Sequence, residues 1–83
     1  MHYRVSMDKL SFAKDIRPMF TDLDVAHMIK AFDLSKREDV VKHAFAIYAA
    51  VSEGTMPPPG TGEQWTKEMC AKFKEWEKQG FPP

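Results

Sequence analysis

The side chain that could most readily do chemistry is Met56, in the stretch EGTMPPPG at residues 53–60. A thioether can ligate haem iron or a soft metal ion, and it can also fill an irregular gap in a core. The prolines that follow lack N–H donors, favour polyproline II geometry and can dock on aromatic surfaces. We favour an internal clasp, in which Pro57, Pro58 and Pro59 pack on tryptophan and Met56 fills the core beneath.

Two histidines are the candidate partners of Met56 for non-covalent haem or metal binding, namely His27 and His43. Asp22 and Asp24 precede His27, and two carboxylates with one imidazole could hold a divalent ion. The same aspartates also suit the first turn of a helix, where the macrodipole favours negative charge, and this structural interpretation is preferred. The chain's six methionines also raise copper(I) binding, but several fall on expected core stripes.

Helical geometry argues against His27 as a haem ligand. A helix over residues 22–32 would bury Val25, Met28, Ile29 and Phe32, and the centre of this stripe lies about 150° around the helix from His27. We therefore expect His27 to face solvent or a partner, while Met28 points inward.

Cys70 is the only cysteine, so an intrachain disulfide and a thiolate zinc site are both excluded. It falls near the start of a predicted helix, where a thiol can be activated, but a small half-buried residue is the preferred interpretation. The sequence has no Gly-x-Ser-x-Gly, phosphate-loop or His-Glu-x-x-His motif, and we expect no enzymatic activity.

Composition narrows the class of partner. Twelve basic and twelve acidic residues cancel, so no net field attracts nucleic acid or an anionic membrane. No apolar run approaches the ~20 residues of a membrane span, and the first ten residues lack the apolar region of a signal peptide. We expect a cytoplasmic protein.

The hydrophobic periodicity predicts an all-α domain, a small bundle of four short helices in one domain of residues 1–83. Residues 1–10 and 81–83 are expected to be flexible or peripheral. The expected helices are residues 12–20 after Ser11, kinked by Pro18; 22–32 after Thr21; one that begins with a Ser35–Glu38 capping box and ends at Gly54; and one that is capped by Thr61 or Thr66 and ends at Gly80.

The expected buried faces are rich in aromatic residues. The third helix should bury Val40, Val41, Ala44, Ile47, Tyr48 and Val51, and the fourth Trp65, Met69, Phe73 and Trp76. Further core aromatics are expected at Phe12, Phe20, Phe32 and Phe45.

The segments DIRPMF, MPP and W-T-K-E…F-K-E-W…G resemble the class I c-type cytochrome domain, mainly its carboxy-terminal half. The pattern over residues 14–83 is also similar to an uncharacterised bacterial family of short helical domains. In the cytochromes the corresponding methionine is an axial haem ligand, which would be Met56. The chain lacks Cys-x-x-Cys-His, and DIRPMFTDLDVAHM occupies the place of that motif. The resemblance therefore implies a cytochrome c-like fold in which an aromatic core replaces the haem, and it implies no function.

The sequence favours a non-enzymatic interaction or accessory module without a cofactor, which binds a protein partner or forms a homo-oligomer. The expected contact surface contains Met56, Pro57, Pro58, Pro59, Trp65, Phe81 and His27. The alternative is a protein that binds haem, a metal or a small ligand through Met56 with His27 or His43.

Overall fold

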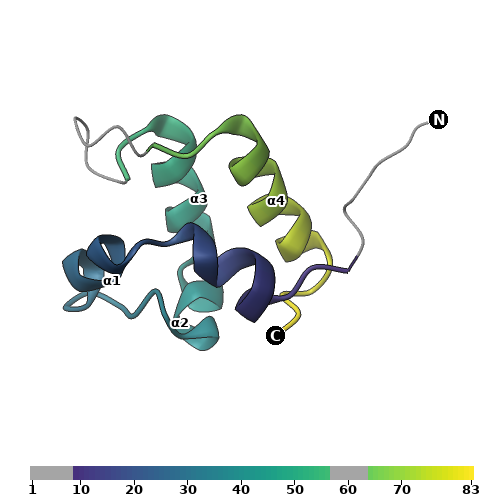
Figure 1. The fold of residues 1–83 in the computed structure, drawn as a ribbon, viewed down its shortest axis with the longest axis horizontal. Coiled ribbons are helices and arrows are strands. Elements are labelled where there is room, and N and C mark those ends of the chain that lie inside the picture. Colours follow the sequence, from purple (N-terminus) through teal and green to yellow (C-terminus); the bar gives the residue numbers. More distant parts are fainter. Residues whose placement is uncertain (1–8, 57–63) are drawn as a thin grey trace.

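The computed structural model describes residues 9–56 and 64–83. This part of the chain contains six short helical segments. They are a π-helical turn η1 (Phe12–Ile16), a 3₁₀ turn η2 (Arg17–Met19), and helices α1 (Asp22–Met28), α2 (Arg37–Lys42), α3 (Ala44–Glu53) and α4 (Lys67–Lys78). Figure 1 shows α3 and α4 beside each other, with η1 close to α4. The all-α prediction is confirmed for these residues, which contain no strand. The four expected helices are divided more finely, because the first and the third are each interrupted.

The first interruption is at Arg17, as Pro18 predicts. The Ser11 hydroxyl accepts a hydrogen bond from the Lys14 N–H at 3.0 Å and so caps η1. The chain then tightens into η2, with Pro18 in its first turn, where a missing N–H costs little. The predicted cap and the predicted break are both confirmed.

Helix α1 begins with a capping box. The Thr21 hydroxyl accepts the Asp24 N–H at 3.1 Å, and the Asp24 carboxylate accepts the Thr21 N–H at 2.9 Å. The helix ends at Met28, four residues earlier than expected, and Ile29 is half exposed. Ile29 therefore does not belong to the buried stripe, whereas Val25, Met28 and Phe32 do pack against the core.

The capping box predicted at Ser35–Glu38 is wrong. Asp33 competes for Ser35 and accepts both its hydroxyl at 2.6 Å and its N–H at 2.9 Å. Both hydrogen bonds lower the pKa of Asp33, and the bond from the hydroxyl has the larger effect. Helix α2 begins only at Arg37, and the residue before it, Lys36, makes no side-chain cap. A local Asp–Ser turn has replaced the helix start.

His43 interrupts the expected third helix and separates α2 from α3. Its backbone (φ −110°, ψ 20°) is not helical, and its ring stacks on Phe32 with centroids 4.1 Å apart. This stacking places His43 against the segment that follows α1.

The core has a connected row of aromatic rings. Neighbouring centroids lie 5.5–5.9 Å apart along the series Phe20, Trp65, Phe73 and Trp76. The rings of Phe12 and Phe81 both contact Trp76, with centroids 5.8 and 5.0 Å away. Aliphatic side chains complete this core: Leu10, Ile16, Leu34, Val40, Ala44, Ile47 and Val51. The predicted burial of Trp65, Phe73 and Trp76 is confirmed, although Trp65 precedes α4 and does not lie on its face.

The prediction that Phe45 belongs to the core is wrong, because its side chain is 86% exposed. Helix α3 buries Ala44, Ile47 and Val51, and Phe45 lies about 130° around the helix from their mean direction. These three residues belong to the apolar face predicted for this helix, and Phe45 lies outside that face.

The carboxy-terminal segment also differs from the expectation that residues 81–83 are peripheral. The Phe12 N–H donates to the Pro82 carbonyl at 2.9 Å, and the Ala13 N–H donates to the Pro83 carbonyl at 3.1 Å. Leu10, which was assigned to the flexible start, is buried in the core. Residues 1–8 are outside the described part of the chain.

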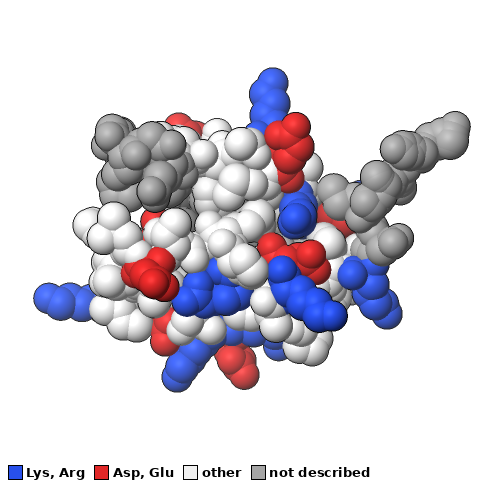
Figure 2. Space-filling view, viewed as in Figure 1, with Lys and Arg blue, Asp and Glu red and all other residues white. Residues whose placement is uncertain are grey.

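The surface carries charges of both signs. Figure 2 shows basic and acidic side chains intermixed around an uncharged central area on the face viewed there. In the described residues, no helix is both long enough and apolar enough to cross a bilayer.

Candidate functional site

The predicted contact surface does not form one patch in the described residues. Trp65 is buried between the rings of Phe20 and Phe73. Phe81 packs on Trp76 after the other end of α4, a helix whose 12 residues span about 18 Å. Pro57, Pro58 and Pro59 are outside the described residues, so the expected clasp cannot be placed. Trp65 and Phe81 are therefore far apart, and both pack mainly against core residues.

Met56 and His27 nevertheless line the same cavity, whose volume is about 240 Å³. Helix α1 contributes Asp24, His27 and Met28 to it, while the end of α3 and the loop that follows contribute Ala50, Thr55 and Met56. His27 is exposed, as expected. The sequence did not predict its proximity to Met56, because that proximity depends on how α1 lies against the end of α3.

The loop that carries Met56 is fixed by its backbone. Gly54 ends α3 with φ 82°, and the N–H groups of Thr55 and Met56 both donate to the Ala50 carbonyl, at 3.0 and 3.3 Å. Met56 is partly buried and packs against the core, which supports the prediction that it fills a gap there. From the same position, Met56 also lines the cavity that it shares with His27.

The capping box divides Asp22, Asp24 and His27, the residues of the alternative metal site, and it agrees with the preferred structural interpretation of the aspartates. Asp24 is 4% exposed and its carboxylate bonds the Thr21 N–H, while Asp22 is exposed at the surface. Within residues 9–56 and 64–83, no three His, Cys, Asp or Glu side chains form a group suited to a metal ion. His43 stacks on Phe32 and does not line the cavity of Met56.

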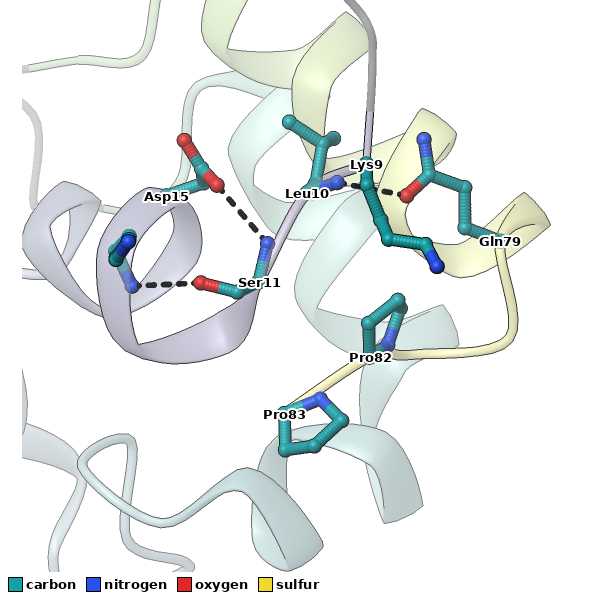
Figure 3. Close-up of a pocket in the computed structure, with 8 residues that line it drawn as sticks. Lys9, Leu10, Ser11, Asp15, Gln79, Pro82 and Pro83 are labelled. Carbon is teal, nitrogen blue, oxygen red and sulfur yellow. Dashed lines mark hydrogen bonds between the residues drawn. The ribbon is translucent and has the colours of Figure 1, made fainter.

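A larger hollow of about 770 Å³ lies where the start of η1 meets the carboxy-terminal segment (Figure 3). Lys9, Ser11 and Pro83 are among its lining residues. Polar groups that line it form hydrogen bonds within the protein: the Leu10 N–H donates to Gln79 Oε1 at 2.8 Å, and the Ser11 N–H donates to Asp15 at 2.9 Å. This hollow is therefore an open junction between two chain segments.

A third hollow, of about 350 Å³, lies between α3 and α4 and is lined in part by Tyr48, Ser52 and Cys70. Burial raises the pKa of the Cys70 thiol, because desolvation disfavours the thiolate. A thiol held in its protonated form is a weak nucleophile, so the hollow offers no activated cysteine.

Large apolar side chains at the surface are the feature that sequence reasoning missed. Phe45 is 86% exposed, Leu23 56% and Ile29 50%. The neighbouring aromatic residue of α3, Tyr48, is covered by Lys74, whose Nζ lies 4.4 Å from the ring centroid. Phe45 is by contrast the most exposed of these side chains. Helix α3 therefore carries one large aromatic ring that is uncovered at the surface.

Comparison with known proteins adds no family to this description: the chain matches no protein-family model, no curated protein and no solved structure.

Proposed function

We propose that the protein is a non-enzymatic interaction module that binds a second copy of itself through the outward face of α3. The observation that carries this proposal is Phe45, whose side chain is 86% exposed on that face. Burying a phenylalanine is worth about 1.5–3 kcal/mol. Its helical neighbours Ala46 and Ala49 are small, so a partner surface can approach the ring closely.

A second copy is the partner that the charges favour. Net charge far from zero keeps proteins apart, and this chain has a formal charge of zero. A two-fold dimer brings the same surface patch of both subunits together, so two Phe45 side chains would be buried, one from each subunit. The contribution of one ring is thereby doubled.

Sedimentation velocity over a range of protein concentrations tests the proposal. We expect a monomer–dimer equilibrium in which Phe45→Ala raises the dissociation constant about 10³-fold, because two rings at about 2 kcal/mol each are lost. Leu23→Ala and Ile29→Ala remove other exposed apolar side chains and should change the constant only a few-fold. A wild-type chain that stays monomeric at every concentration, or a Phe45→Ala variant that dimerises normally, would overturn the proposal.

A second candidate function is ligand binding at the cavity between His27 and Met56. Shared lining by these two residues favours it. The volume of about 240 Å³ is below the range of about 300–1,000 Å³ usual for drug-sized ligands, and so favours an ion or a small molecule over a haem. Titration with hemin and with zinc, for wild type and Met56→Ala, tests it. Equal affinities of the two proteins would exclude a direct role of Met56.

Two further statements remain predictions. The resemblance to c-type cytochrome domains would gain support from an experimental structure whose helices superpose on such a domain. The cytoplasmic location can be tested by cell fractionation with an antibody to the natural protein.

A further inference from the structure

We propose that the cavity lined by His27, Met28 and Met56 is a site for a soft monovalent metal ion, copper(I). The proposal rests on the second candidate function above and names its ligand. Three residues with donor side chains, from two separate elements, line this cavity: His27 and Met28 from α1, and Met56 from the loop after α3.

The donor set selects the ion. Thioether sulfur is a soft ligand that favours copper(I), and imidazole binds the same ion well. Zinc prefers thiolate, imidazole and carboxylate ligands. Among the described residues that line this cavity, the only carboxylate is that of Asp24, which already accepts the Thr21 N–H. Two thioethers and one imidazole therefore point to a monovalent ion.

The position of the donors suits binding from solvent. Met28 and Met56 line the cavity and are partly buried against the core. His27 also lines the cavity and is exposed, so an ion can reach its imidazole from solvent. The backbone of Met56 is held by its bond to the Ala50 carbonyl, which limits the movement of this ligand.

Charge also favours a cation. Asp24 is 4% exposed and lines the cavity, and the one ion pair among the described residues joins Lys74 to Glu77. The carboxylate of Asp24 therefore has no cationic side chain paired with it in this part of the chain. A cation in the cavity would lie near that carboxylate in a partly desolvated setting, where attraction is stronger than in water.

Silver(I), which does not change oxidation state here, is the first probe, followed by copper(I) in competition with bicinchoninate without oxygen. The protein carries Cys70→Ser, so that its thiol cannot bind the ion. We expect one equivalent to bind and to shift the ε-methyl carbon resonances of Met28 and Met56. The resonances of Met19 and Met69, which do not line the cavity, should stay in place.

Volume-conserving variants identify the ligands. Met28→Leu and Met56→Leu should each weaken copper(I) binding at least about tenfold, and His27→Gln should weaken it similarly. Met69→Leu is the matched control and should bind within about twofold of the parent, since Met-to-Leu exchange preserves packing. Thermal unfolding of each variant without metal separates a lost ligand from a lost fold.

Parent-like copper(I) affinity in both Met28→Leu and Met56→Leu would overturn the inference. If neither copper(I) nor silver(I) binds, but hemin or zinc binds and depends on Met56, the inference fails while the second candidate function stands. If none of these probes binds, both fail. The association test at Phe45 is performed without metal and is independent of either result.

Discussion

The indole Nε1–H of Trp76 donates to the carbonyl oxygen of Pro82 at 2.8 Å. The same oxygen accepts the Phe12 N–H at 2.9 Å, and the rings of Phe12 and Trp76 lie 5.8 Å apart. Arg37 adds a bond from its Nε to the Phe81 carbonyl at 2.7 Å. One buried tryptophan therefore joins α4 to η1 and to the carboxy-terminal segment, whose Phe81 packs against the core.

Replacing Trp76 with phenylalanine should lower the free energy of unfolding by about 1–3 kcal/mol, because a hydrogen bond is lost and a smaller ring leaves a gap. The Pro82 carbonyl keeps its bond from Phe12, so no buried acceptor is stranded. Urea unfolding measures the change. Amide exchange should also accelerate at Phe12 and Ala13, and unchanged exchange there would refute the proposed link.

Two phenylalanines provide a matched test of buried against exposed position. Phe73 is fully buried between Trp65 and Trp76, so Phe73→Ala should cost about 3–5 kcal/mol. A domain of 83 residues has roughly 4–12 kcal/mol to lose. Phe45→Ala should change stability by no more than about 0.5 kcal/mol when measured on the monomer, since it removes little packing and alanine favours helix.

Urea unfolding at low protein concentration measures both variants. Similar destabilisation by the two changes would mean that Phe45 is packed in the folded monomer, contrary to its exposure in the structure.

Local chemistry made several features predictable from the sequence. Ser11 and Thr21 were expected caps, and Thr66 was one of two expected for α4, where its hydroxyl accepts the Met69 N–H at 3.1 Å. Gly54 and Gly80 end helices with φ of 82° and 88°, which glycine adopts at little cost. Each of these features depends on residues within one turn of each other.

Competition and tertiary packing made other features unpredictable. Ser35 was as well placed for a helix cap as Thr21, but Asp33 captured its hydroxyl at 2.6 Å. The stacking of His43 on Phe32 accompanies the break between α2 and α3, and it joins side chains eleven positions apart. The cavity shared by His27 and Met56 needs α1 to lie against the end of α3, which periodicity within one helix does not specify.

Gly54 should tolerate alanine poorly for a reason of backbone conformation alone. Its φ is 82°, and a Cβ added there would meet nothing within 4 Å, so no steric clash contributes. Gly54→Ala should cost about 1–2 kcal/mol, and Gly54→Asn less, because asparagine adopts left-handed geometry more readily. Thermal unfolding compares the variants. Equal stability of the alanine and asparagine variants would indicate that the loop after α3 relaxes to a negative φ.

Cys70 should react slowly with a disulfide reagent such as Ellman's reagent. Burial raises the pKa of its thiol in the folded protein, and the thiolate is the reactive form. The reaction rate at neutral pH should be several-fold below that of the urea-unfolded chain, measured at matched reagent concentration. Equal rates for the folded and unfolded protein would contradict the partial burial of this thiol.

The same raised pKa sets the sign of a stability change at alkaline pH. As pH rises, the unfolded chain releases the thiol proton first, so it holds fewer protons than the folded state between the two pKa values. Stability is therefore fully present below the unfolded pKa and decreases as pH rises toward the folded pKa. Urea unfolding between about pH 7 and 10 should show this decrease in wild type. The decrease should be smaller in Cys70→Ala, and identical pH profiles for the two proteins would show that other groups cause it.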